Sequence, residues 1–312
     1  MATPLCKAST SSRVRVACIG DSLTRGDGSH ERRPPKRLAQ RGNYPAKLQE
    51  LLGTGFWVRN FGHGGATACN SSEIPMAATR EFAAARRWRP DVAVLMLGTN
   101  DAKKQHWEAA TPCGGAPAYR SGLLQLLRAL GVAANVQSAR RERPPPLVVL
   151  LHPPPVLRDR WGISRRLLPL VRTELRALFP PPPAEATASA AACARGRAVL
   201  MPKELPIAAE RQVFIQDGIH LNARGSGALA CAAFAELVRL CDWPSRCVDA
   251  AKHAAWQRRL GGECRAALAT SPSGASTAEK LRRSKLVERL RAGARGVAQV
   301  GPVPPIIMAH VK

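Results

Sequence analysis

A serine placed directly after an apolar run is the first residue of this chain whose surroundings suggest chemistry. The segment 20–24, Gly-Asp-Ser-Leu-Thr, follows the apolar residues 16–19. A serine hydroxyl is a weak nucleophile at neutral pH, so Ser22 needs a base, an orienting acid and oxyanion donors nearby to attack an acyl carbon. Thr24 stands where the G-x-S-x-G elbow of α/β-hydrolases has its second glycine, so that fold is not indicated.

An aspartate and a histidine later in the chain are candidates for the acid and the base. His220 is our candidate for the general base that takes the proton from Ser22 and later returns it to the leaving alcohol. Asp217, three residues earlier, can hold the imidazole in one tautomer and stabilise its charged form. An Asp-x-x-His pair alone is often only a helix-entry motif, so this interpretation depends on the other segments.

Three groups are candidates for the donors that stabilise an oxyanion. They are the backbone N–H of Ser22, the backbone N–H of Gly65 and the side-chain amide of Asn100. Gly65 belongs to the glycine-rich segment 60–67, and Asn100 belongs to Gly-Thr-Asn-Asp at 98–101. Asn-Asp after a strand is by itself an ordinary turn signal. Because these segments occur in order and at predicted strand ends, together they indicate one site.

Alternating strands and helices must position these residues. We expect strands at 14–19, 56–60, 91–97, 147–151 and 198–201, and helices at 44–52, 73–88, 118–132, 163–178 and 223–241. This alternation predicts a parallel sheet with helices on both faces, in which ligands bind beyond the carboxyl ends of the strands. Ser22, Gly65 and Asn100 all follow predicted strand ends, so a shared site is expected there.

The four segments resemble those of the SGNH or GDSL hydrolase family, over roughly residues 13–241. The residues that match its four name-giving positions and its triad aspartate are Ser22, Gly65, Asn100, His220 and Asp217. The resemblance implies a flavodoxin-like three-layer α/β/α sandwich with a five-stranded parallel sheet. It also implies a cofactor-free esterase or lipase that forms an acyl-enzyme intermediate. The segment 96–103 with Trp107 resembles the branch that includes bacterial-type carbohydrate acyl esterases.

We therefore expect a serine esterase that hydrolyses short-chain acyl esters, acetyl esters in particular, through a Ser-His-Asp triad. The expected partner is a small acyl ester of an alcohol such as a sugar hydroxyl, and no cofactor or metal is expected. One alternative is a lipase or lysophospholipase that acts at anionic membranes. Another is a non-catalytic binding module. The two enzymatic hypotheses differ in substrate and share their catalytic residues, and the fold does not choose between them.

Several side chains near the predicted strand ends allow two interpretations. His63 either contacts substrate as part of the pocket wall or points to solvent. Trp107 either forms a pocket wall or packs at the sheet edge. The basic segment 25–41 leaves the nucleophile directly, and it is either a rim that favours anionic substrates or membrane surfaces, or a solvated surface insertion.

The charge of the chain suggests acidic partners without naming one. Its 47 Lys and Arg against 22 Asp and Glu give a net charge of +25. Aromatic residues make up only 4% and are not interleaved with a basic stripe, so we expect no specific nucleic-acid binding. We predict a disordered N-terminus at 1–12, a hydrolase domain at 13–245 and a basic, partly helical or disordered extension at 246–312. The extension is either a membrane-surface or partner-docking appendage or a solubilising tail.

The cysteines and the N-terminus indicate where the protein resides. Nine cysteines make an odd number with no C-x-x-C pair, which disfavours zinc and redox sites. Cys18 and Cys231 fall in predicted core elements, as free thiols of a reducing compartment do. Cys241 and Cys247 can bridge if oxidised, but free thiols are the favoured interpretation. Residues 1–15 lack the apolar core of a secretory signal and resemble an organellar transit peptide only weakly, so we expect a cytoplasmic protein.

Overall fold

The computed structural model describes residues 13–29, 42–108, 111–132, 145–180, 197–201 and 211–241. The chain divides into two units, residues 1–271 and 272–312, and every described residue belongs to the first. The predicted N-terminal segment 1–12 and the predicted basic extension 246–312 lie outside the described residues, so the proposed domain boundaries stay predictions.

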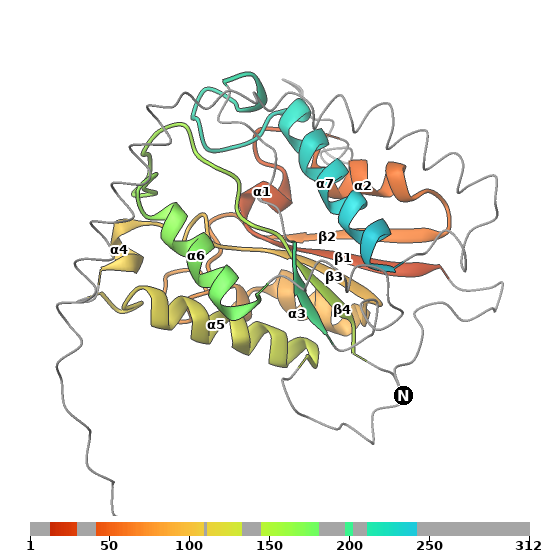
Figure 1. The fold of residues 1–312 in the computed structure, drawn as a ribbon, viewed down its shortest axis with the longest axis horizontal. Helices are drawn as coiled ribbons and strands as arrows, with labels where there is room; N and C mark the ends of the chain where they lie inside the picture. Colours follow the sequence, from red (N-terminus) through yellow and green to blue (C-terminus); the bar gives the residue numbers. More distant parts are fainter. Residues whose placement is uncertain are drawn as a thin grey trace, which may run out of the picture. The chain divides into compact units, whose positions relative to one another are not determined.

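Five parallel strands form one sheet in the order β2-β1-β3-β4-β5 (Figure 1). They span Val14–Gly20 (β1), Phe56–Gly62 (β2), Val92–Met96 (β3), Leu147–Leu150 (β4) and Ala198–Leu200 (β5). This strand order is the flavodoxin-like one, so the predicted fold class is confirmed. Each strand overlaps a predicted one, and β1 places Val16 and Cys18 on one face and Ala17 and Ile19 on the other.

Helices cover both faces of the sheet and bury these side chains (Figure 1). The helices on one face are α2 (Tyr44–Leu52) and α7 (Ala223–Cys241), and those on the other are α3 (Arg80–Trp88), α5 (Ala116–Leu130) and α6 (Leu168–Leu178). Because both faces of β1 and β3 are covered, their sequences are almost continuously apolar. None of the described helices is long and apolar enough to cross a membrane.

The helix predicted from residue 73 begins later, at Arg80. Pro75 lacks a backbone N–H and disfavours a helical conformation in the residue before it. The residues Met76–Ala78 form only a short 3₁₀-helix, η1. Thr79 then caps α3 by accepting a hydrogen bond from the Phe82 N–H at 3.1 Å. Glu73 is therefore left in the preceding loop.

A one-turn helix that the sequence analysis missed, α1 (Ser22–Arg25), follows β1 directly. Asp21 caps it by accepting a hydrogen bond from the Leu23 N–H at 2.9 Å. The end of β2 lies very close to this turn, and a Cβ at Gly62 would stand 2.2 Å from the Arg25 backbone nitrogen. Any larger residue than glycine at this position would displace the turn that carries Ser22.

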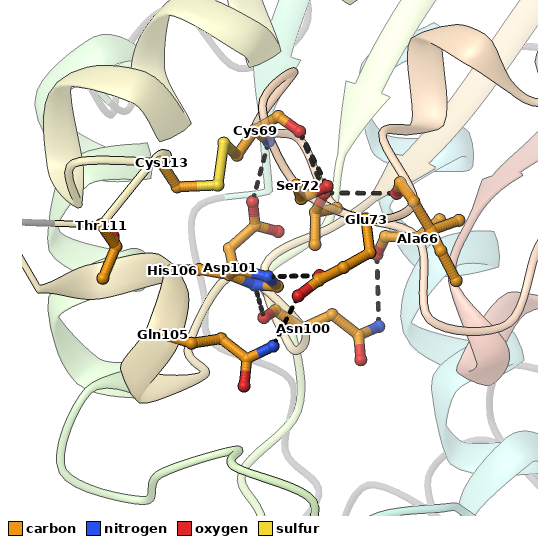
Figure 2. Close-up of polar contacts among 12 residues, drawn as sticks. Ala66, Cys69, Ser72, Glu73, Asn100, Asp101, Gln105, His106, Thr111 and Cys113 are labelled. Atoms are coloured by element: carbon orange, nitrogen blue, oxygen red, sulfur yellow. Dashed lines mark hydrogen bonds and ion pairs between the residues drawn. A yellow bond between two sulfur atoms is a disulfide. The ribbon is translucent and has the colours of Figure 1, made fainter.

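The prediction of free core thiols is confirmed for Cys18 and wrong for Cys231. Cys69 and Cys113 form a disulfide (Figure 2), and Cys231 is also disulfide-bonded. Among the described residues, Cys18 is the free cysteine, and burial raises the pKa of its thiol to about 12. Disulfides persist mainly in oxidising compartments, so they remove the support that free thiols gave to a cytoplasmic location.

Removing the Cys69–Cys113 disulfide should lower the free energy of unfolding. The bond joins residues 44 positions apart, so the loop-closure relation gives an upper estimate of about 4 kcal/mol. We expect a Cys69→Ala/Cys113→Ala variant to unfold at a lower urea concentration than the oxidised wild type, with an equal or steeper slope because its unfolded chain is not cross-linked. Equal midpoints for the two proteins would contradict a stabilising role of the bond.

Candidate active site

Ser22, His220 and Asp217 form a continuous row of hydrogen bonds. His220 Nε2 lies 2.9 Å from Ser22 Oγ, and His220 Nδ1 lies 2.6 Å from Asp217 Oδ2. The other oxygen of Asp217 accepts hydrogen bonds from the N–H groups of Ile219 and His220, which fixes the carboxylate within its turn. A carboxylate at Nδ1 makes that nitrogen the donor, so Nε2 of the neutral ring can accept the hydroxyl proton.

Asp217 is ionised in this arrangement. Burial raises the pKa of its carboxyl, but the hydrogen bonds from the His220 ring and from the backbone N–H groups of Ile219 and His220 outweigh burial. The pKa of Asp217 therefore lies below its usual value. A carboxylate at this position stabilises the positive charge that the ring gains when it takes a proton.

The register of the sheet brings three loops to one place. Gly20 at the end of β1 pairs with Gly62 on β2 and with Met96 on β3, so three neighbouring strands end at the same level. The residues that follow these ends by two, three and four positions are Ser22, Gly65 and Asn100. The strand pairing thus explains why the three loops lie close together, as predicted.

The candidate oxyanion donors lie on these loops. Asn100 is buried, and its Nδ2 donates to the Ala66 carbonyl at 3.2 Å (Figure 2). The amide has a second N–H, whose only described contact is the long one of 3.5 Å to Asp21. Gly65 turns the chain with a φ of 78°. Within the described residues, the N–H groups of Ser22 and Gly65 donate to no protein acceptor, so the site can offer donors to a developing negative charge.

Asp101 fastens the loop after β2 to the turn after β3. Its carboxylate accepts hydrogen bonds from the Ala68 N–H at 2.9 Å and from the Cys69 N–H at 3.0 Å, and Figure 2 shows the second of these. Burial raises the pKa of Asp101 to about 6, although these N–H groups lower it. The disulfide to Cys113 holds the same loop from its other side. The sequence analysis missed this link between the two loops, because it treated Asp101 only as a residue of the Asn-Asp turn.

The His106 side chain contacts the backbone of Asn100 and holds its loop in place. Its Nδ1 lies 2.8 Å from the Asn100 carbonyl oxygen, and its Nε2 lies 2.8 Å from the Glu73 carboxylate (Figure 2). The Glu73 backbone N–H and His106 lower the pKa of Glu73 to about 2. Nothing in the spacing of the sequence links these residues. In the described part of the chain, no group of three or more His, Cys, Asp or Glu side chains forms a possible metal site.

The GDSL-like lipase/acylhydrolase family matches residues 18–228, which is more than half of the chain. The chain belongs to this family. The match includes the three loops and the His220 turn, and it confirms the family predicted from Ser22, Gly65, Asn100 and His220. Since the family is one of lipases and acylhydrolases, it also supports the prediction of a hydrolase that acts on ester bonds.

Individual relatives carry more specific names. An acetylxylan esterase from Xylanibacter ruminicola is 33% identical over 163 residues, which are 50% of this chain and 31% of that protein. The match thus spans about a third of the relative's length. A putative arylesterase from Agrobacterium tumefaciens has a TM-score of 0.49 at 22% identity, covering 73% of this chain and 99% of the other. A carbohydrate acetylesterase family member from Sinorhizobium meliloti has a TM-score of 0.48 at 20% identity, with the same coverage. The sheet topology itself establishes the fold.

Two predicted pocket residues of this GDSL-like chain have other contacts. His63 is half-buried, and its Nδ1 lies 2.8 Å from the Glu81 carboxylate on α3. Trp107, in the short helix α4 (Lys104–Trp107), packs beside Tyr119 with ring centroids 6.2 Å apart. Both side chains therefore have protein partners, and their contact with substrate stays a prediction.

The predicted basic rim is described only at its beginning. Arg25 forms an ion pair with Asp27, and its Nε donates to that carboxylate at 2.7 Å. The charge of Arg25 is therefore balanced locally. Residues 30–41, which hold the other basic residues of the segment, lie outside the described residues, as does the basic extension. Binding to an anionic substrate or membrane surface through these segments stays a prediction.

A tryptophan that no motif singled out lies beside the His220 ring. The ring centroids of Trp161 and His220 are 5.6 Å apart, and Trp161 is 54% exposed. The helix predicted from residue 163 begins only at Leu168, and before it Arg160 and Ile163 bond to each other's backbone and close a tight turn. The sequence gives no signal for this contact, since Trp161 and His220 lie on separate loops.

Asp21 is a buried acid next to Ser22. Burial raises the pKa of its carboxyl from 3.8 to about 7, although the Leu23 N–H and the charge of His220 lower it. The folded protein thus holds a proton that the unfolded chain loses at lower pH. As pH rises from 3.8 to about 7, this difference lowers the free energy of unfolding, and the loss remains above that range.

The Asp21→Asn substitution should flatten this part of the stability profile. Asparagine resembles the neutral acid and keeps an acceptor for the Leu23 N–H. We expect the wild type to lose up to about 4 kcal/mol relative to the variant over the window from 3.8 to about 7. Urea unfolding of both proteins across this pH range measures the difference. Parallel profiles would show that the Asp21 carboxyl is not shifted upward.

Proposed function

We propose that this chain is a serine esterase that removes a short acyl group, acetyl in particular, from a sugar hydroxyl through an acyl-enzyme. The observation that carries the proposal is the row from Ser22 Oγ to His220 Nε2, at 2.9 Å, and from His220 Nδ1 to Asp217, at 2.6 Å. Nucleophile, base and orienting acid are in hydrogen-bond contact in the order that acyl transfer requires.

In the first half of the proposed reaction, Ser22 Oγ attacks the acyl carbon while its proton passes to His220 Nε2. The carbonyl oxygen becomes an oxyanion, which receives hydrogen bonds from the N–H groups of Ser22 and Gly65 and from the second N–H of Asn100. The bond to the alcohol then breaks, and His220 gives the proton to the departing alcohol oxygen. The product of this half is an ester of Ser22.

In the second half, water takes the position of the alcohol. His220 Nε2 accepts a proton from the water as its oxygen attacks the acyl carbon, and the same donors hold the second oxyanion. Collapse releases the carboxylic acid and returns the proton to Ser22 Oγ. Asp217 remains ionised throughout and stabilises the charged ring in both halves, which agrees with its lowered pKa.

Two observations support a short acyl group and a carbohydrate alcohol. The Ile74 side chain approaches Gly65 so closely that a Cβ there would stand 3.0 Å from its Cδ1. An apolar side chain beside an oxyanion donor suits a small apolar acyl group. The relative that is 33% identical is named an acetylxylan esterase, and the shared part includes about half of this chain. The described residues offer no comparable support for a lipid substrate.

Ser22→Ala should lower the hydrolysis of p-nitrophenyl acetate by several orders of magnitude, because removal of one triad member disables the whole row. The matched control is Ser121→Ala, which changes an exposed serine on α5 and should leave the rate unchanged. Steady-state rates of both variants, measured with circular dichroism to verify folding, test the proposal. A Ser22→Ala variant as active as the wild type would refute the site.

A fluorophosphonate probe separates the esterase from a non-catalytic binding module. The probe forms a covalent bond only with a serine whose hydroxyl has been activated by a base. We expect mass spectrometry to locate the label on Ser22 in the wild type and to find none in a folded His220→Ala variant. Folded wild-type protein that takes no label would favour the binding module.

A further inference from the structure

The turn that carries Trp161 has an unfavourable residue at its tip. The Arg160 N–H donates to the Ile163 carbonyl at 3.2 Å, and the Ile163 N–H donates to the Arg160 carbonyl at 2.9 Å. Between them, Trp161 has a φ of 52° and Gly162 a φ of 80°, the positive values that a type I′ turn requires at both central positions. Asn-Gly is the favoured pair there, whereas a bulky side chain is disfavoured at positive φ.

The strained tip is fastened to the loop after β3. The Lys104 N–H donates to the Gly162 carbonyl at 3.1 Å, and the Ser164 N–H donates to the Ala102 carbonyl at 3.0 Å. These bonds leave the turn little freedom to relax. Strain of this kind persists where the surrounding structure enforces it, and it is concentrated at functional sites. The conformation of Trp161 therefore calls for an explanation other than packing.

Burial does not explain the residue either. Trp161 is 54% exposed, although the Arg160 guanidinium lies over its ring at 4.6 Å from the centroid. A tryptophan that served only to support His220 would hide most of its apolar surface. Instead, the indole is held by Arg160 on one side, lies near the His220 ring and keeps more than half of its area open to solvent.

The position of the ring relates it to the alcohol part of a substrate. In the proposed reaction, His220 Nε2 protonates the leaving oxygen, which must then lie about 3 Å from that nitrogen. The Trp161 ring centroid is 5.6 Å from that of His220. The oxyanion donors, in contrast, belong to the loops after β1, β2 and β3 and receive the carbonyl oxygen. A ring attached to the leaving oxygen therefore lies within reach of the Trp161 indole.

We infer that Trp161 is the binding surface for the alcohol part of the substrate, and that this alcohol is a sugar ring. One face of a pyranose presents aliphatic C–H groups, which pack well on the electron-rich face of an indole. The Arg160 guanidinium beside it can donate hydrogen bonds to neighbouring sugar hydroxyls. This inference rests on the proposed esterase function and specifies which residue recognises the leaving group.

The test compares two acetyl esters that differ in the alcohol. One is an acetylated methyl xyloside and the other is ethyl acetate, whose alcohol has no ring to stack. Trp161→Asn removes the indole but places a residue that the turn favours, so its free energy of unfolding should not fall. Trp161→Phe keeps an aromatic face. Trp57→Ala is the matched control, because Trp57 is also exposed beneath an arginine but lies near the start of β2.

We expect Trp161→Asn to raise KM for the xyloside ester about fivefold to tenfold with little change in kcat, and to leave kcat/KM for ethyl acetate unchanged. Trp161→Phe should restore part of the loss, and Trp57→Ala should behave as the wild type. An equal loss with both esters, or no loss with either, would overturn the inference. If the wild type hydrolyses ethyl acetate alone, the sugar assignment fails but the esterase stands. If it hydrolyses neither ester, the proposed function fails and the inference fails with it.

Discussion

The hydrogen bond between Ser22 Oγ and His220 Nε2 joins residues 198 positions apart, and the proposed chemistry of the site depends on it. A single bond of this kind contributes only about 1 kcal/mol, so it cannot by itself hold the two loops together. The packing of α7 does so. Its residues Leu229, Ala233 and Phe234 are fully buried against α2 and one face of the sheet, and this fixes the turn that precedes the helix. Disruption of that core would separate base and nucleophile without changing either.

The site also concentrates buried carboxyl groups, whose environments differ in a way that suits different tasks. Asp217 receives hydrogen bonds from an imidazole and two backbone N–H groups, and its pKa lies below the usual value. Asp21 and Asp101 are more deeply buried, and burial raises their pKa values to about 7 and about 6. Asp217 is thus suited to carry a negative charge that faces the imidazolium of His220. Asp21 and Asp101 instead accept hydrogen bonds from backbone N–H groups, and these bonds fix the loops that carry Ser22 and Asn100.

Much of this architecture could be predicted because it follows from local patterns. Strands β1, β3 and β4 are nearly continuous apolar runs that are largely buried on both faces, and the residues after parallel strands must meet at the carboxyl edge of the sheet. The motif residues Ser22, Gly65 and Asn100 could be found for the same reason, whereas His220 was found from its spacing to Asp217 and from the family resemblance. Helix α3 begins later than predicted because Pro75 prevents the helix from starting at residue 73.

The remaining contacts could not be predicted because they join loops whose approach no periodicity encodes. The Cys69–Cys113 disulfide links the loop after β2 to the segment before α5. The His106–Glu73 pair likewise depends on how two loops fold. Trp161 reaches His220 only through a turn that a tryptophan disfavours, so residue preferences point away from the observed conformation. Sequence reasoning identified the residues of the proposed reaction, and the structure adds those that hold or extend the site.

Rapid-quench mass spectrometry during the hydrolysis of an acetyl ester tests the central claim most directly. Acid quenching within the first turnover, followed by digestion, reports which side chain carries the acetyl group. The account predicts a single acetylated peptide that contains Ser22, formed in the wild type before the acid accumulates and absent from the His220→Ala variant. Rapid turnover with no acetylated Ser22 at any time, or with the acetyl group on another residue, would contradict the account.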